Sequence, residues 1–286
     1  MNLFSGLEKF GLKSVASMQV FEEEQKDKKG EGDDGKKEIV HTEEEFLFDK
    51  TIVCCVCDKE FKTKRVKNGR VRMLKSDPDL RPRFQFIDTL KYGITSCPFC
   101  GYAAINRNFE HLAPAQRRLI KEQICSQFQP TIQYDGATIS YEMAIDRYKL
   151  SLLNAIVKKG RASEKSYICL NLAWLLREKA STMPEGTPGE KAARAECQKE
   201  GETFYGQAYE GFLKAISQEM FPLCGMEEST VDYLLAYMSF HFKKFDISAK
   251  FLSSVITSPS ASRRAKDMAL ELRNEIRAIL TKQKKP

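Results

Sequence analysis

The larger, C-terminal part of the chain has apolar residues at helical spacing. From Ala113 onward they recur three and four positions apart, which places them on one face of successive amphipathic helices. Ser140 is a typical helix N-cap, and Gly160 is a typical C-terminal stop. The pattern predicts about seven helices, over 114–128, 140–158, 163–180, 190–218, 227–243, 246–257 and 261–282.

A different pattern precedes these helices. Between Phe46 and Leu112, β-rich pieces occur at 51–53, 70–74 and 92–95, with turn residues between them. The apolar residues are too few for a large core, so this unit needs a covalent or metal staple. We therefore predict a mainly α protein with a small β-rich zinc ribbon at 46–112. A helical domain follows at 113–286.

The N-terminal segment is expected to lie outside both domains. Residues 1–21 have a loose amphipathic pattern, which suits packing on the protein itself, a partner, or peripheral contact with a membrane. Residues 22–45 are almost all charged or small, which predicts a disordered linker. No apolar run approaches twenty residues, so we expect no transmembrane segment.

The cysteines indicate the cellular compartment and the chemistry. There are nine, an odd number, and the start of the chain lacks the features of a secretory signal. We expect a reducing, cytoplasmic location, where clustered cysteine pairs are more typical of metal ligands than of disulfides.

Four of these cysteines form two CxxC pairs, Cys54–Cys57 and Cys97–Cys100, separated by 39 residues. Four thiolates suit tetrahedral Zn²⁺, and we predict one structural zinc ion on Cys54, Cys57, Cys97 and Cys100. Gly101 supplies the left-handed residue that should follow the second pair, and Asp58 replaces it in the first. Cys55 is the alternative ligand, and a dithiol redox pair is the alternative chemistry.

The sequence offers no catalytic constellation. A Cys₄ zinc shell is closed to substrate, and neither HExxH nor a His-x-Glu partner for the CxxC pairs is present. The three histidines lie in the linker (His41), in a loop (His111) and in an aromatic-rich stretch of the predicted helical core (His241). We therefore assign no catalytic or cofactor-binding residue and expect a protein that is not an enzyme.

Positive charge is concentrated in the β-rich unit. The net charge of the chain is +7, and residues 54–100 alone carry 11 basic and 5 acidic residues. This density, with aromatic residues available for stacking, fits a nucleic-acid-binding surface. The alternatives are that the aromatics form a small core, and that Arg70 and Arg72 pair with Asp77 and Asp79. The residues concerned are Lys62, Lys64, Arg65, Lys67, Arg70, Arg72 and Lys75, with Phe61, Phe84, Phe86 and Tyr92.

One part of the helical domain nearly fits a tetratricopeptide repeat. In residues 232–259, Ala236 and Ser248 are small where two helices must cross closely. Phe245 is the aromatic at the turn, although Ser239 stands where an aromatic is usual. An ordinary helical bundle is the alternative.

The stretch CCVCDKEFKTKRVKNGRVRMLKSDPDLRPRFQFIDTLKYGITSCPFCGYAA, with LNLAWLLRE further on, resembles a bacterial family known only as domain of unknown function 2225. The resemblance covers about 50–280. It implies a Cys₄ ribbon followed by tetratricopeptide-like helices, and it implies no established activity. Cys55 departs from the family pattern, which tends to have proline there. The matching positions are Cys54, Cys57, Phe61, Arg70, Arg72, Asp77, Pro82, Tyr92, Cys97, Pro98, Cys100, Gly101 and Tyr102.

Together these features favour a non-enzymatic zinc-binding interaction or scaffold protein. The helical array would be the surface that binds a protein or peptide partner. The alternative is a nucleic-acid-binding protein that acts through its basic ribbon.

Overall fold

The computed structural model describes residues 41–130 and 136–283. The predicted amphipathic segment 1–21 and most of the predicted linker 22–45 lie outside the described residues. At the end of the linker, Glu43–Phe46 forms a 3-10 helix. Its Glu43 carboxylate accepts a hydrogen bond from Lys91 Nζ at 2.6 Å and another from the Tyr92 hydroxyl at 2.9 Å. These bonds tie the start of the described chain to the β-rich unit.

Two antiparallel hairpins form the β-rich unit. Strands β1 (Leu47–Val53) and β2 (Glu60–Val66) make the first, and β3 (Ile94–Ser96) and β4 (Ala103–Ile105) make the second. In the first hairpin Ile52 lies opposite Phe61, and both side chains are buried. The sequence indicated parts of β1 and β3, but it gave no separate indication of β2 or β4.

The strand expected at 70–74 is not formed, and a single bridge between Met73 and Phe84 takes its place. Beyond it the chain turns tightly: Leu80 N donates to Asp77 O, and Asp77 N donates to Arg81 O. Leu80 has a φ of 66°. This left-handed residue, together with the prolines at 78 and 82 that lack an N–H, prevents a regular ladder. Residues 77–83, which we call the 77–83 loop, instead reach the helices.

The remaining described chain is helical, as the apolar spacing predicted. The Ser140 hydroxyl caps the helix that follows by accepting from Met143 N at 3.2 Å. That helix ends before Lys159, which has a φ of 55°. The seven described α-helices are α1 (Pro114–Ile120), α2 (Tyr141–Val157), α3 (Ala162–Thr182), α4 (Pro188–Gln218), α5 (Glu228–His241), α6 (Phe245–Thr257) and α7 (Arg263–Gln283). A π-helical turn, Lys121–Cys125, continues α1.

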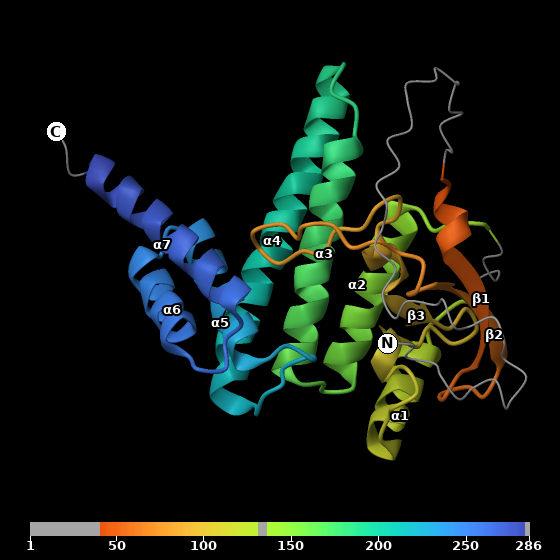
Figure 1. Ribbon diagram of the computed structural model, residues 1–286. Coiled ribbons are helices and arrows are strands. Elements are labelled where there is room, and N and C mark those ends of the chain that lie inside the picture. The colour runs from red at the N-terminus through yellow and green to blue at the C-terminus, as the bar shows by residue number, and fades with distance from the viewer. Residues whose placement is uncertain (1–40, 131–135, 284–286) are drawn as a thin grey trace, which may run out of the picture. The chain divides into compact units, whose positions relative to one another are not determined.

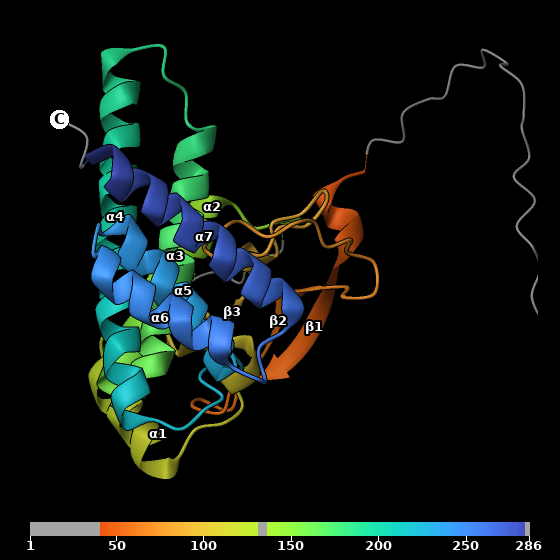
Figure 2. The same ribbon diagram turned by 60° about the vertical axis from the view of Figure 1, so that its left-hand side comes forward.

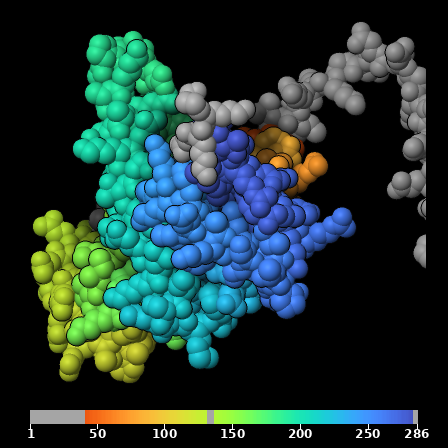
Figure 3. Space-filling model, turned by 90° about the vertical axis from the view of Figure 1, so that its left-hand side faces the viewer, coloured from red at the N-terminus to blue at the C-terminus, as the bar shows by residue number. Residues whose placement is uncertain are grey.

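The long helices α3 and α4 run side by side through the middle of the described part (Figure 1). Helix α2 packs on α3 and faces the hairpins, whereas α5, α6 and α7 follow on the side of α4 (Figure 2). From that side, α5–α7 cover the lower part of α4, and the ends of α3 and α4 project above them (Figure 3).

Helices α5 and α6 form the helix-turn-helix unit predicted at 232–259. The Ser248 hydroxyl donates to the Ala236 carbonyl oxygen at 2.7 Å, and both residues are fully buried where the helices cross. Small residues at this point let the helix axes approach closely. The unit has the expected helix-turn-helix form, and its assignment as a tetratricopeptide repeat stays a prediction.

One apolar core joins the hairpins to the helices. It includes Leu47 and Ile94 from the strands as well as Ile168 and Leu172 from α3. The hydroxyl of Tyr148, on α2, donates to the Leu90 carbonyl oxygen at 3.1 Å across this junction. The two predicted domains, 46–112 and 113–286, therefore share a core and lie within one compact unit. No described helix combines the length and apolarity needed to cross a membrane.

Candidate metal centre and its contact with the helices

Each CxxC pair lies in the tight turn that closes a hairpin. In the first turn Asp58 N donates to Cys54 O, and in the second Gly101 N donates to Cys97 O. Asp58 has a φ of 59° and Gly101 a φ of 73°. Both left-handed residues are those that the sequence indicated. The two turns are therefore built alike, with Asp58 in place of the glycine.

The two turns bring the four predicted cysteines together. Their sulfur atoms all lie within 4.8 Å of one another. Cys54 Sγ lies 3.6 Å from Cys100 Sγ, and Cys57 Sγ lies 3.6 Å from Cys97 Sγ. A tetrahedral metal with metal–sulfur bonds of about 2.3 Å separates its ligands by about 3.8 Å. The cluster could hold a metal ion, and the spacing of its sulfurs suits a tetrahedral one.

Cys55 is outside this cluster. Its sulfur points the other way and donates a hydrogen bond to the Phe109 carbonyl oxygen at 3.1 Å. The same oxygen accepts from the buried Tyr102 hydroxyl at 3.1 Å. The alternative ligand considered from sequence is thus engaged in the small core beneath the turns.

The cluster also has the electrostatics of a cation site. Hydrogen bonds from Cys100 and Cys97 lower the pKa of the Cys54 thiol, whereas donation to Cys54 raises the pKa of Cys100. Four thiolates this close repel one another, so they cannot all ionise without a positive ion between them. Binding a metal here therefore displaces protons from the thiols.

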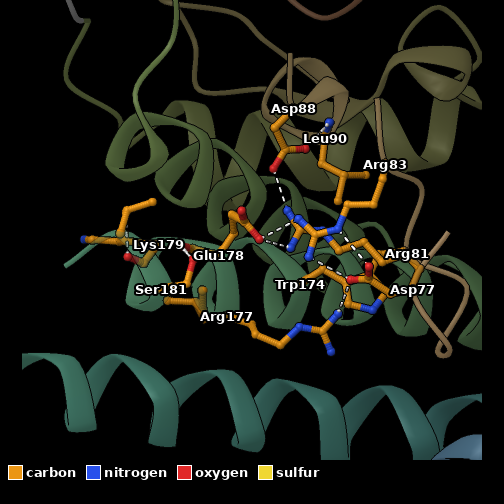
Figure 4. Close-up of polar contacts among 12 residues, drawn as sticks. Asp77, Arg81, Arg83, Asp88, Leu90, Trp174, Arg177, Glu178, Lys179 and Ser181 are labelled. Atoms are coloured by element: carbon orange, nitrogen blue, oxygen red, sulfur yellow. Dashed lines mark hydrogen bonds and ion pairs between the residues drawn. The ribbon is translucent and has the colours of Figure 1, made fainter. Parts of the chain in front are cut away.

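A partly buried network of charges, with Arg81 at its centre, holds the β-rich unit to the helices. Arg81 is 1% exposed. Its guanidinium donates to Glu178, on α3, at 2.5 Å and to Asp88 at 2.6 Å. Arg83 donates to the same Glu178 carboxylate oxygen at 2.7 Å and binds Asp77 through two hydrogen bonds of 2.8 Å. In Figure 4, these side chains from the 77–83 loop converge on one stretch of α3.

The second half of this network involves Asp79, which is 1% exposed. Its Oδ2 accepts hydrogen bonds from Trp174 Nε1 and from Arg177 Nη1, both at 2.7 Å. Trp174 and Arg177 lie one turn apart on α3, so one carboxylate fixes both side chains. We call the contact of Asp77, Asp79, Arg81 and Arg83 with α3 the loop–α3 contact.

Trp174 and Arg177 also form one wall of a cavity of about 410 Å³ between α3, α4 and α5. Tyr205 and Tyr237 line it from the other helices. The Tyr205 side chain is 5% exposed, and its hydroxyl has no hydrogen-bond partner among the described residues. Burial also raises the pKa of Tyr205, so the hydroxyl stays protonated and remains a donor.

At the rim of this cavity the structure corrects one expectation. His241 is not packed in the helical core: it is exposed, and its Nε2 lies 2.8 Å from Glu202 Oε2 on α4. It meets the Tyr205 ring edge-on, with ring centroids 5.1 Å apart. His241 is the last residue of α5, where the helix ends and leaves one side of the ring in solvent.

The basic run of the β-rich unit is partly used within the protein. Arg65 donates to the Thr95 hydroxyl at 2.7 Å, and Lys64 pairs with Asp49 at 3.0 Å. Arg70 and Arg72 are exposed. They do not pair with Asp77 and Asp79, because Arg83 and Arg177 bind those carboxylates. The aromatics offered for stacking divide as follows: Phe61 and Tyr92 are buried, Phe84 is partly buried, and Phe86 is exposed.

Sequence reasoning missed the loop–α3 contact and the cavity. The sequence suggests turn positions for Asp77 and Asp79, or pairing with Arg70 and Arg72, and gives no indication of a role for Arg81. One signal was available, because the only tryptophan of the chain, Trp174, lies in the apolar run 172–176, which the charged residues Arg177 and Glu178 follow directly. Buried charges need partners, and the closely spaced charged residues at 77–83 were the candidate partners.

Comparison with known families identifies one match. The family described as "Uncharacterized protein conserved in bacteria (DUF2225)" matches residues 47–276. This span includes both CxxC turns, the 77–83 loop and all of α1–α6. No curated protein and no solved structure matches the chain.

Proposed function

We propose that this chain, which belongs to the bacterial DUF2225 family of uncharacterised proteins, is a non-enzymatic interaction protein with a structural zinc ion. A peptide segment of a protein partner binds in the cavity between α3, α4 and α5. The observation that carries the proposal is Tyr205, which lines that cavity and whose buried hydroxyl has no hydrogen-bond partner among the described residues. A buried polar group without a partner is costly, and a bound acceptor removes the cost.

Zinc is the metal that best suits the four cysteines. Thiolate ligands favour Zn²⁺, and a shell of four leaves no open position for substrate. The ion then holds the two hairpins together, because their own apolar core is small. The hairpins in turn position the 77–83 loop, whose Asp79 orders Trp174 and Arg177 in the cavity wall.

The lining of the cavity defines the occupant. Its volume of about 410 Å³ lies within the usual range of ligand sites. Trp174, Tyr205 and Tyr237 provide aromatic walls for an apolar stem, and the Tyr205 hydroxyl requires an oxygen acceptor. A peptide side chain with an aliphatic stem and a terminal amide or carboxylate meets both requirements.

The lining also argues against catalysis. None of the described residues around this cavity is a serine, threonine or cysteine that His241 could activate. The His241–Glu202 pair lies at the exposed rim, with side chains 38% and 60% exposed. We therefore assign this pair to recognition at the rim.

The decisive experiment selects partners at the cavity itself. A photo-crosslinking amino acid at position 198, which lines the cavity, should capture a partner in bacterial cells. The matched control is position 196, exposed on the same helix but turned about 200° away. Peptides from the captured segment should then bind the purified, zinc-loaded protein. Equal capture from both positions would contradict the proposal.

Two hydroxyl deletions then test the recognition chemistry. Tyr205→Phe removes the unpaired donor and should weaken peptide binding about tenfold. Tyr233→Phe is the control, because its hydroxyl already donates to Pro78 O at 3.1 Å. Unchanged affinity with Tyr205→Phe would place the binding site elsewhere.

Nucleic-acid binding by the basic ribbon is the alternative function, and it rests on the exposure of Arg70 and Arg72. Two of its four stacking aromatics, Phe61 and Tyr92, lie in the core. If the alternative holds, replacing both arginines with alanine lowers the salt slope of log K by about 2, because two phosphate contacts are lost. We expect no such nucleic-acid affinity to lose.

A further inference from the structure

A second cavity, of about 610 Å³, lies on another part of the described protein. Its walls come from the segment after β4, from the turn between α2 and α3, and from residues 222–225. Arg107, Lys159 and Arg161 line it, and all three are exposed. Within the described ranges, no carboxylate forms an ion pair with any of them. Three cationic side chains therefore line one cavity without an ion-pair partner among the described residues.

The carboxylate in this cavity is already neutralised. Glu164 Oε1 pairs with Lys158 Nζ at 2.7 Å, and both side chains are almost fully buried. Asn108 Nδ2 adds a longer bond of 3.4 Å to the same oxygen. Glu219, which follows α4, accepts hydrogen bonds from the backbone N–H and hydroxyl of Ser163 at the start of α3, at 3.0 and 2.5 Å, and keeps its negative charge. Arg107, Lys159 and Arg161 outnumber this one carboxylate, so the cavity keeps its positive balance.

Arg107 is held in position for a ligand. Its guanidinium lies over the Tyr167 ring, 5.3 Å from the centroid. A side chain at residue 225 would lie 2.9 Å from Arg107 Nη1, so the glycine there lets the guanidinium approach the backbone. Gly225 also has a φ of 79°, which other residues rarely adopt. A guanidinium fixed in this way loses little freedom when it binds.

We propose that this cavity binds a small phosphate-bearing anion through Arg107, Lys159 and Arg161. The two guanidinium groups present forked donors that match the oxygens of a phosphate, and Lys159 adds a third charge. The cavity is large enough for pyrophosphate or for a phosphomonoester with part of its carrier. The site is separate from the peptide cavity of the proposed function, with which it shares no lining residue.

Calorimetric titration of the zinc-loaded full chain with inorganic pyrophosphate, at constant ionic strength, tests the proposal. We expect saturable binding at concentrations below about 10 mM. Arg107→Ala and Arg161→Ala should each weaken pyrophosphate binding about tenfold. Arg161→Lys should bind more tightly than Arg161→Ala, because it keeps the charge. Arg118→Ala is the matched control, because it removes the same charge from a side chain that is 76% exposed on α1.

Folding is monitored by zinc content and by the far-UV circular dichroism of each variant. Absence of saturable binding by the wild type overturns the proposal. So does an equal loss with Arg118→Ala, which would show unspecific attraction to net charge. Comparing adenosine 5′-monophosphate with pyrophosphate separates a phosphomonoester from a free anion, and adenosine should not bind because it lacks the phosphate. If a single-stranded oligonucleotide binds while both small anions fail, the site is a nucleic-acid surface and the proposal is wrong.

Discussion

Asp79 Oδ2 accepts a hydrogen bond from Trp174 Nε1 at 2.7 Å, across 95 residues of sequence. The carboxylate comes from the loop between the two CxxC turns, and the indole lines the cavity between α3, α4 and α5. The pair therefore connects the candidate metal centre to the candidate binding site. Loss of the metal should disturb the cavity through this contact.

The buried guanidinium of Arg81 should be the most sensitive point of the loop–α3 contact. Replacing Arg81 with alanine removes the buried arginine partner of Asp88 and leaves Glu178 with only the partly exposed Arg83. Breaking such a pair costs about 3–5 kcal/mol, so we expect that loss in the free energy of unfolding. Urea denaturation measures it. The control is Arg72→Ala, an exposed residue, which should change stability by less than about 0.5 kcal/mol.

The metal prediction is tested by replacing a predicted ligand, Cys97, and a cysteine outside the cluster, Cys55. Purified protein should contain about one equivalent of zinc by elemental analysis, and Cys97→Ser should abolish it, because structural zinc needs four thiolates. Cys55→Ser is the matched control and should keep the ion, since its sulfur bonds to Phe109 O instead. Retention of zinc by Cys97→Ser, or its loss with Cys55→Ser, would contradict the ligand set.

The left-handed residues of the two turns allow a second test of the metal centre. Gly101→Ala should weaken zinc retention against a chelator. A Cβ at Gly101 would clash with the Phe128 ring, and the φ of 73° is itself unfavourable for alanine. Asp58→Gly at the equivalent place of the first turn should retain zinc as well as the wild type does, because glycine accepts the φ of 59° without strain. Equal effects of the two changes would show that turn geometry does not govern binding.

The loop–α3 contact should lose strength in acid. Although burial opposes it, the hydrogen bonds from Arg83 hold the pKa of Asp77 below its usual value. Arg83 and Arg81 do the same for Glu178. Since unfolded carboxyls titrate near about pH 4, this stabilisation is complete above that pH and disappears as the pH falls through the lower native pKa values.

The measurement is the free energy of unfolding between neutral pH and about pH 3. The pH dependence should be smaller for the double variant Asp77→Asn with Glu178→Gln, which cannot titrate at these positions. Zinc is measured at each pH, because protonation of the thiols also releases metal. An identical pH dependence in both proteins, at full zinc occupancy, would exclude these two carboxyls as the cause.

The features predicted correctly from sequence are those that depend on local chemistry. The helix start at Ser140 follows from a cap, and the metal turns follow from CxxC with Asp58 or Gly101 behind it. The contact between Arg81 and Glu178 could not be predicted in this way, because its partners lie 97 residues apart. A single sequence shows which residues are charged, but not which carboxylate a given arginine will meet in the folded protein.

The alternative pairing of Arg70 and Arg72 with Asp77 and Asp79 is not found. Asp77 pairs with Arg83, six residues further on, and Asp79 pairs with Arg177, 98 residues away, which a single sequence does not indicate. The cavity was out of reach for a similar reason, because Tyr205 and Trp174 lie on different helices. Each helix pattern identified a buried face, but not the space left where three helices meet.

The position of the loop–α3 contact has a consequence for synthesis on the ribosome. The chain emerges from its N-terminus, so both CxxC turns and the 77–83 loop leave the ribosome before Trp174 and Glu178 are made. The two turns could therefore bind a metal ion while Asp79 is still hydrated and Arg81 has Asp88 but not Glu178 as a partner. A nascent chain halted before α3 would contain both hairpins, and the charged side chains of the 77–83 loop would be exposed to water. Helix α3, arriving later, then covers these side chains.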